Sequence, residues 1–79
     1  MVTPESIHLN IAQGMETVHL NVDGDGHHFE AVVVSGVFAG KSRIQRHQMV
    51  YQTLGDRMRD EIHALSMKTY TPQEWQEKS

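Results

Sequence analysis

Apolar residues recur along the chain at helical spacing in two places, and each place predicts a helix. In residues 4–13, Ile7 and Ile11 lie one turn apart, which indicates a short helix with one buried face. A second helix is expected over residues 43–54, followed at Gly55 by a break or bend and then by a further short helix over residues 56–62. The apolar side of the helix over residues 43–54 is expected to consist of Ile44, Val50, Tyr51 and Leu54.

Three other segments predict strands. From Glu16 onward the apolar residues alternate with polar ones, which is typical of a strand with one face toward solvent. Residues 29–35 form a β-branched run that indicates a more deeply buried strand, and the Asp-Gly-Asp-Gly sequence at 23–26 is suited to the turn between these two. After His63 the period returns to two. The alternating apolar residues are Val18, Leu20 and Val22 in the first strand and Leu65 and Met67 in the third.

Helix-capping signals support these boundaries. Thr3 followed by Pro4 is suited to an N-cap and a first helical residue, because proline at that position loses no hydrogen bond, and Gly14 is a suitable stop. Ser42 can cap the helix that starts at Arg43. The sequence Thr-Pro-Gln-Glu at 71–74 is a capping box, and it predicts a last helical turn that carries Trp75. The large side chain of Trp75 is expected to cover the core, the alternative being an anchor for a partner.

The predicted order of elements is α-β-β-α-α-β-(α), which fits an α+β fold. The first two strands should pair as an antiparallel hairpin, and the third, which follows a helical crossover, should lie parallel to a neighbour. We therefore expect a two-layer α/β sandwich in which helices cover one face of a three-stranded mixed sheet, and one domain over residues 1–79.

The composition narrows the function. The chain has 79 residues and no cysteine, which excludes disulfides, thiol nucleophiles and a four-thiolate metal or iron–sulfur site made by the chain alone. No apolar run approaches the ~20 residues of a membrane span, and the first residues do not resemble a signal peptide. We expect a cytoplasmic protein with no membrane association.

Charge is unevenly distributed along the chain. Residues 1–40 contain five acidic residues and no Lys or Arg, whereas residues 41–59 contain five basic residues and one acid, within a total net charge of −3. Arg43 and Arg46 are expected to face away from the apolar side of their helix. The candidates for a partner or nucleic-acid surface are Lys41, Arg43, Arg46, Arg57, Arg59 and Lys68, although such a run is more often simply a solvated helix face.

Motifs for catalysis are absent from the sequence. The six histidines include no pair at helical i, i+4 spacing and no HExxH motif, and Asp-Gly-Asp-Gly lacks the lysine of a phosphate-binding loop. We therefore expect a protein that is not an enzyme. His8 and His19 are predicted to be surface residues, and His47 is predicted to lie on the apolar side of its helix.

His63 is distinctive by position, because it lies between the last interior helix and the third strand. A neutral imidazole there is a suitable ligand for iron or zinc. The alternative is that His63 simply interacts with the C-terminus of the preceding helix, whose dipole favours a cation.

Three stretches of the chain resemble the BolA family, in particular its bacterial BolA-like members. They are GDGHHFEAVVVS (24–35), FAGKSRIQRHQMVY (38–51) and IHALSMKTYTPQEW (62–75), in the order and spacing of the family's motifs. The resemblance implies the family's class II KH-like fold, which agrees with the predicted order of elements.

The resemblance also implies a function. Members of this family pair with monothiol (CGFS-type) glutaredoxins and share a [2Fe–2S] cluster with the glutaredoxin and its bound glutathione, in iron–sulfur cluster trafficking and iron homeostasis. The family's cluster ligands fall on His63 and on the hairpin loop, at His28 or the neighbouring His27. The isolated chain would hold no cluster of its own, and it would be a monomer or a weak homodimer.

Two further functions remain open at this point. The family resemblance includes transcriptional regulators, and the basic segment could contact DNA, but the G-x-x-G loop of KH modules is missing and the pI of about 6.0 is low for a nucleic-acid binder. A metal-free apolar interaction module is the third interpretation.

Overall fold

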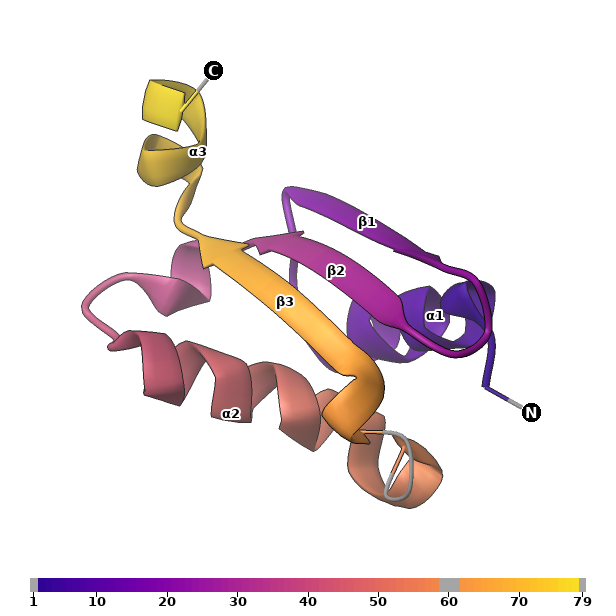
Figure 1. Cartoon of the computed structure of the whole chain (residues 1–79). Coiled ribbons are helices and arrows are strands. Elements are labelled where there is room, and N and C mark those ends of the chain that lie inside the picture. Colours follow the sequence, from indigo (N-terminus) through magenta and orange to yellow (C-terminus); the bar gives the residue numbers. More distant parts are fainter. Residues whose placement is uncertain (1, 59–61, 79) are drawn as a thin grey trace.

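The computed structural model describes residues 2–58 and 62–78. Within these residues there are three α-helices and three strands, which Figure 1 labels along the sequence. They are α1 (Pro4–Gly14), β1 (His19–Gly24), β2 (Phe29–Val34), α2 (Arg43–Leu54), β3 (Leu65–Tyr70) and α3 (Pro72–Lys78), with short 3-10 turns at Gly36–Phe38, Gly55–Met58 and Ile62–Ala64.

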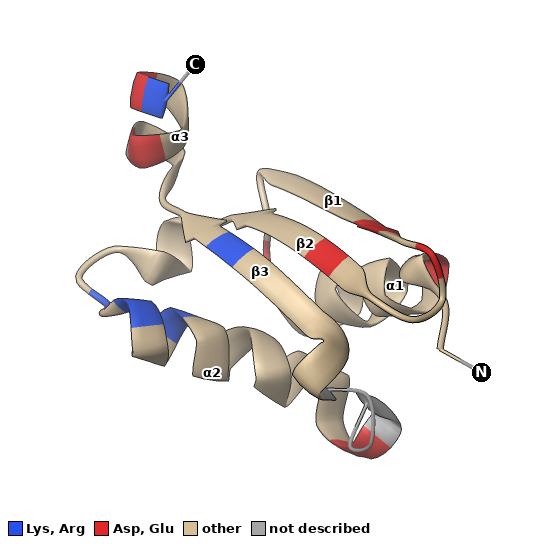
Figure 2. Cartoon of the chain, viewed as in Figure 1, with Lys and Arg blue, Asp and Glu red and all other residues tan. Residues whose placement is uncertain are grey.

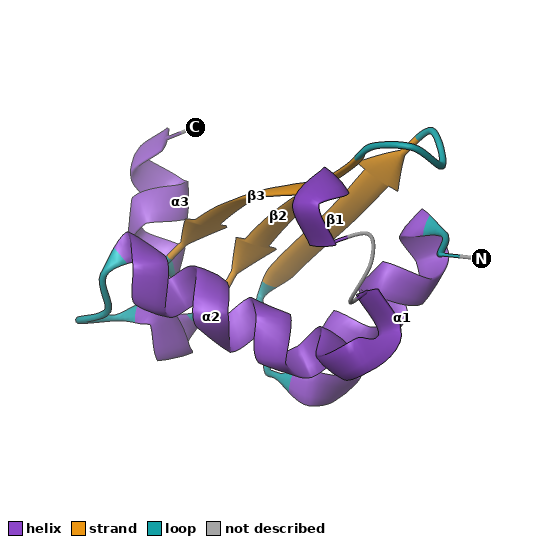
Figure 3. Ribbon diagram, turned by 60° about the horizontal axis from the view of Figure 1, so that its bottom comes forward, coloured by secondary structure: helices purple, strands orange, loops and turns teal. Residues whose placement is uncertain are grey.

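The strands form one mixed sheet in the order β1-β2-β3. β1 pairs antiparallel with β2, and β3 pairs parallel with β2, because the crossover through α2 returns the chain to the end at which β2 began. α1 and α2 lie together on one face of this sheet (Figure 3), so the predicted α+β sandwich with a three-stranded mixed sheet is confirmed.

Side-chain caps set the start of each helix. Thr3 accepts a hydrogen bond from the Ser6 amide, and Ser42 accepts one from the Gln45 amide, so both predicted N-caps are confirmed. At α3 the Thr71 amide donates to Glu74, and the Glu74 amide donates back to the Thr71 hydroxyl, which is the predicted capping box.

The core lies between the sheet and the first two helices. β2 contributes residues to it at every second position, as does β3, where Leu65 and Met67 are buried and Ser66 and Lys68 are exposed. This confirms the alternation predicted for the third strand. The core cluster is made up of Ile7, Ile11, Phe29, Ala31, Val33, Phe38, Val50, Leu54, Leu65 and Met67.

Gly14 was predicted to end the first helix as a C-terminal stop, but its glycine is required by close packing instead. It is the last residue of α1, and Met15 follows as the C-cap in extended backbone. A β-carbon at Gly14 would lie 2.7 Å from Cβ of Thr53, so a glycine lets α1 approach α2 at this point.

Two apolar residues were wrongly assigned to the interior. Val18 precedes β1 and is 68% exposed, and Ile44 in the first turn of α2 is 70% exposed. Periodicity identifies the apolar face of a helix or strand. It does not show at which residue that face is no longer covered by the element packed against it. The predicted helix over residues 56–62 also differs, since Gly55–Met58 forms a 3-10 turn and residues 59–61 lie outside the described residues.

Trp75 does not pack against the core cluster that it was expected to cover. Its ring stacks on His19, with ring centroids 4.9 Å apart, and lies against Tyr70 at 5.4 Å. His19 and Tyr70 flank Val34 in the strand register, and Val34 is completely buried although it alternates away from the core. α3 therefore covers the end of the opposite face of the sheet, where β2 and β3 finish.

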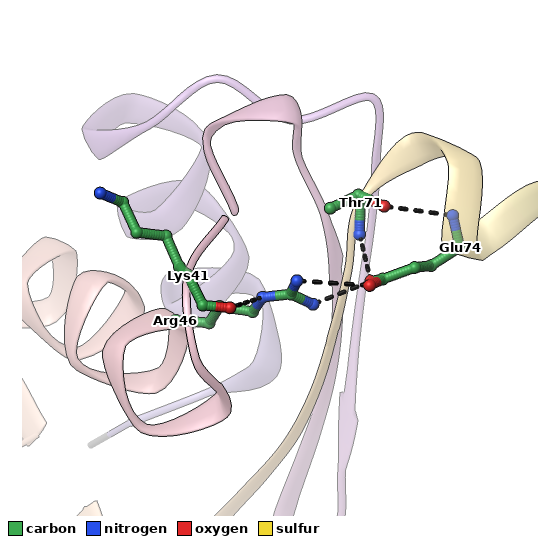
Figure 4. A network of polar contacts seen from close by, with 4 residues as sticks. All are labelled: Lys41, Arg46, Thr71 and Glu74. Carbon is green, nitrogen blue, oxygen red and sulfur yellow. Dashed lines mark hydrogen bonds and ion pairs between the residues drawn. The ribbon is translucent and has the colours of Figure 1, made fainter. Parts of the chain in front are cut away.

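Arg46 joins α2 to α3, contrary to the prediction that it faces away (Figure 4). Its guanidinium donates to both carboxylate oxygens of Glu74, and its Nε donates to the carbonyl oxygen of Lys41. The guanidinium carbon lies 5.9 Å from the centroid of the buried Phe38 ring. This hydrogen bonding lowers the pKa of Glu74, chiefly through Arg46 and then through the Thr71 amide.

Candidate functional site

The parallel pairing of β2 and β3 brings two distant parts of the sequence to the same end of the sheet. Phe29, the first residue of β2, is the register partner of Leu65, the first residue of β3. The hairpin loop that carries His27 and His28 therefore enters the sheet beside the 3-10 turn Ile62–Ala64, which carries His63. We call these three histidines, His27, His28 and His63, the histidine end of the sheet.

The hairpin loop is held by one carboxylate. Oδ1 of Asp25 accepts hydrogen bonds from the His27 and His28 amides, both at 2.9 Å, and the Asp25 amide donates to the carbonyl oxygen of His28 at 3.1 Å. The amide of His28, and then that of His27, lower the pKa of Asp25 below its ordinary value, so the carboxylate stays ionised in neutral solution. The loop backbone is fixed in this way, while both imidazoles are exposed.

Glycines make this loop possible in two different ways. Gly26 has a φ of +94°, which side chains disfavour. Gly24 has ordinary φ, but a β-carbon on it would lie 2.6 Å from the carbonyl oxygen of His28 and 2.6 Å from Cδ1 of Phe29. Gly24 therefore allows the tight approach that places His28 directly before the sheet.

His63 is exposed, and no hydrogen bond from another described residue occupies its ring. It therefore has a ring nitrogen open to solvent, as a metal ligand supplied to a partner would need. His63 is also the basic residue in the last turn of the 3-10 helix Ile62–Ala64, so an interaction with a helix C-terminus stays the alternative; part of the helix predicted before it lies outside the described residues.

The other histidines fall largely where the sequence predicts. His8 is exposed on α1, and His19 is exposed, although its ring stacks on Trp75. His47 is half-buried beside β3, and burial, followed by the charge of Arg43, lowers its pKa.

The basic candidates are divided among several places. Figure 2 shows basic residues gathered at the start of α2, where Lys41 and Arg43 are exposed, and on β3, where Lys68 is exposed. Arg46 lies nearby but is engaged by Glu74. Arg57 lies in the 3-10 turn after α2, and Arg59 lies outside the described residues.

This donor set is incomplete for any metal. Among residues 2–58 and 62–78, no three His, Cys, Asp or Glu side chains are grouped so that they could hold an ion. Imidazole nitrogens are borderline ligands suited to iron, and two of them on one iron are known from Rieske-type [2Fe–2S] centres. The described part of the histidine end therefore offers imidazole donors without forming a complete metal site of its own.

Sequence reasoning missed the role of Asp25, which it interpreted only as a turn former. A carboxylate two and three residues before paired histidines is a signal for an Asx-type turn, and that signal was available in the sequence. The engagement of Arg46 by Glu74 had no local signal, because the two residues lie on different helices.

Within the described residues, none of the helices has the length and apolarity needed to span a bilayer.

Known proteins similar to this chain agree on one family. The model of the family described as "BolA-like protein" matches residues 2–74. Acid stress protein IbaG of Escherichia coli is 43% identical over 72 residues, which cover 90% of this chain and 82% of that protein. DNA-binding transcriptional regulator BolA of Vibrio cholerae is 50% identical over 54 residues, 68% of this chain and 51% of that relative, so the match spans about half of its length.

The fold is similar to solved structures as well. The structure of a BolA protein homologue from Coxiella burnetii matches with a TM-score of 0.80 and 46% identity, covering 96% of this chain and 99% of that one. The names of the two relatives describe a stress protein and a regulator, and neither name describes an enzyme.

Proposed function

The chain belongs to the BolA-like protein family, and from that premise we propose that it is a non-enzymatic cytoplasmic partner of a monothiol glutaredoxin. The two proteins would share a [2Fe–2S] cluster as cargo, for iron–sulfur cluster trafficking and iron homeostasis. The observation that carries this proposal is the histidine end of the sheet. Two segments with exposed histidines lead into the adjacent parallel strands β2 and β3 at the same end of the sheet.

The donor chemistry assigns a role to each partner. The chain has no cysteine, so it supplies nitrogen ligands from His63 and from His28 or His27. The sulfur ligands come from the glutaredoxin cysteine and from glutathione. A bound cluster would supply electron-accepting and iron–sulfur transfer chemistry, and this chain would bind it and position it.

Protonation should regulate this role. A protonated imidazole has no lone pair to donate, so cluster binding should weaken as the pH falls through the range in which histidine titrates. Asp25 keeps its negative charge in that range, because the ordinary pKa of a carboxyl already lies well below it and the backbone hydrogen bonds lower the pKa further, so the loop should keep its form while the ligands are lost.

The test mixes the pure protein with a monothiol glutaredoxin that carries its cluster. We expect a change in the visible absorption spectrum and a heterodimer on gel filtration. His63→Ala should abolish the spectral change while far-UV circular dichroism stays the same. His8→Ala is the matched control, since it removes a histidine from α1 that is also exposed.

Single His28→Ala and His27→Ala variants identify the loop ligand, since one of them should abolish the spectral change and the other should not. An unchanged spectrum with the unmodified protein, or a His63→Ala variant that behaves like the unmodified protein, would refute the proposal.

DNA binding is the second candidate function. It is favoured by the name of the Vibrio cholerae relative, a DNA-binding transcriptional regulator, and by exposed Lys41 and Arg43 at the start of α2. Several phosphate contacts would require a steep decrease of log K with log salt concentration. A shallow slope, or no binding to duplex DNA at low salt, would exclude this function.

A further inference from the structure

β3 is an edge strand, and a shallow trough follows it. Among the described residues β3 pairs with β2 alone. One hollow of about 190 Å³ lies between α2 and β3, and a second of about 300 Å³ continues around Ser66 and reaches residues 30–32 of β2. Both hollows are lined by Arg43, Met67 and Lys68, so they adjoin along the strand. We call this surface, Arg43 and His47 of α2 with residues 66–70 of β3, the edge trough.

The free backbone groups of β3 can be identified from one hydrogen bond. The Ser35 amide donates to the carbonyl oxygen of Tyr70 at 3.0 Å, so the backbone N–H and C=O of Tyr70 point toward β2. Successive residues of a strand direct these groups to alternate sides, which turns those of Ser66 and Lys68 toward β2 as well. The N–H and C=O groups of Met67 and Thr69 therefore point away from the sheet, along the open edge.

The charged side chains around this edge are mainly basic. Arg43 and Lys68 are exposed and make no ion pair with another described residue, whereas nearby Arg46 is neutralised by Glu74. His47 has a lowered pKa and is neutral near pH 7. Glu30 is the one acidic residue that lines the second hollow, so the two cations outnumber it.

We propose that the edge trough binds an extended acidic segment of a partner protein, which adds a fourth strand beside β3. Met67 and Thr69 would each donate and accept one backbone hydrogen bond, and acidic side chains of the segment would lie close to Arg43 and Lys68, which line the same two hollows. Exposed strand edges bind extended chains in this way, with affinity from the backbone and selectivity from side chains. The trough uses none of the three candidate cluster ligands, so this inference does not depend on the proposed function.

The test titrates the ¹⁵N-labelled full chain with a terminally blocked octapeptide in which Glu alternates with Thr. We expect the largest amide shifts at Met67 and Thr69. Two matched peptides separate the contributions. In the first, the peptide amides that would hydrogen-bond to β3 are N-methylated. This peptide keeps its charge but cannot pair with the strand, and it should show no detectable binding. A Lys–Thr peptide keeps the backbone but reverses the charge, and should also fail to bind.

Protein variants complete the test. The double variant Arg43→Gln/Lys68→Gln should weaken binding of the Glu–Thr peptide by roughly five- to tenfold, the size expected for two exposed ion pairs. Lys41→Gln, which removes one charge outside the trough, should change binding less than twofold in comparison.

Several results would overturn the proposal. They are the absence of shifts with the acidic peptide at millimolar concentration, equal binding of the N-methylated peptide, and equal binding of the Lys–Thr peptide. A homodimer in sedimentation whose Met67 and Thr69 amides are protected from exchange would assign the edge to a second copy instead. A single-stranded oligonucleotide that shifts the same amides where the acidic peptide does not would assign it to nucleic acid.

Discussion

Gly24→Ala tests whether tight packing at the end of β1 positions the histidine loop. A β-carbon at this position would lie 2.6 Å from the carbonyl oxygen of His28 and 2.6 Å from Cδ1 of Phe29. Both distances are far below normal van der Waals contact. One of the obstructing atoms belongs to the backbone and the other to a buried ring, so neither can move aside alone.

The magnitude follows from two opposing effects. Alanine in a strand is favoured over glycine by about 0.5–1 kcal/mol. Forcing an extra carbon into close packing costs about 1–3 kcal/mol. We therefore expect a net destabilisation of about 1–2 kcal/mol, which for a domain of this size lowers the Tm by roughly 5–15 °C.

Thermal unfolding followed by far-UV circular dichroism measures this change, with two glycine controls. Gly36→Ala meets nothing within 4 Å and has no positive φ, so its stability should be unchanged or raised by up to about 1 kcal/mol. Gly26→Ala also meets open space, but its φ of +94° disfavours alanine, and we expect a cost of about 1–2 kcal/mol. In ¹H–¹⁵N spectra, Gly24→Ala should shift the Phe29 amide more than Gly36→Ala does.

The reasoning fails if Gly24→Ala unfolds at the same temperature as Gly36→Ala. It also fails if the Phe29 and His28 amides keep their chemical shifts, because the loop would then accept the extra carbon without moving.

Further predictions concern the contacts around α2. Arg46→Gln should lower the free energy of unfolding at pH 7 by about 1–2 kcal/mol, since it removes the contacts to Glu74 and to the Lys41 carbonyl oxygen. The contribution of Glu74 exists above its ordinary pKa and is lost as the pH falls through its lowered folded pKa, so urea unfolding should show a smaller difference between Arg46→Gln and the unmodified protein at pH 3. His47 has a lowered pKa in the folded state, so its contribution to stability is complete above its ordinary pKa of 6.5 and decreases as the pH falls below it. His47→Gln should therefore reduce the loss of stability between pH 7 and pH 5, and an unchanged slope would contradict the burial of this imidazole.

The sequence was sufficient for elements that depend on nearby residues. The N-caps at Thr3, Ser42 and Thr71 were predicted because a cap and the amide that it accepts from lie three residues apart. The third strand was predicted because alternation of Leu65 and Met67 is itself the evidence for a buried face. The resemblance to a family then led to the histidine end, whose ligand roles stay predictions.

Contacts between distant elements were beyond sequence reasoning. Nothing near Arg46 in the sequence indicates an ion pair with Glu74. Likewise, nothing near Gly14 indicates that Thr53 packs closely against it. Trp75 was expected to cover the core, and the pattern does not show that α3 lies against the other face of the sheet. In each case the deciding partner comes from a different part of the chain.

The parallel neighbours β2 and β3 have a thermodynamic consequence. His28 and His63 come to the same end of the sheet only when β2 and β3 pair, after the segment between them, which includes α2, has folded. Any cargo that bridges both imidazoles therefore ties together the two ends of that closure, and at a hundredfold excess over its Kd it would add about 2.7 kcal/mol to cooperative stability. Binding of such a cargo and folding of the chain would then be linked equilibria. The chain without cargo would unfold at a lower temperature or denaturant concentration than the chain with cargo.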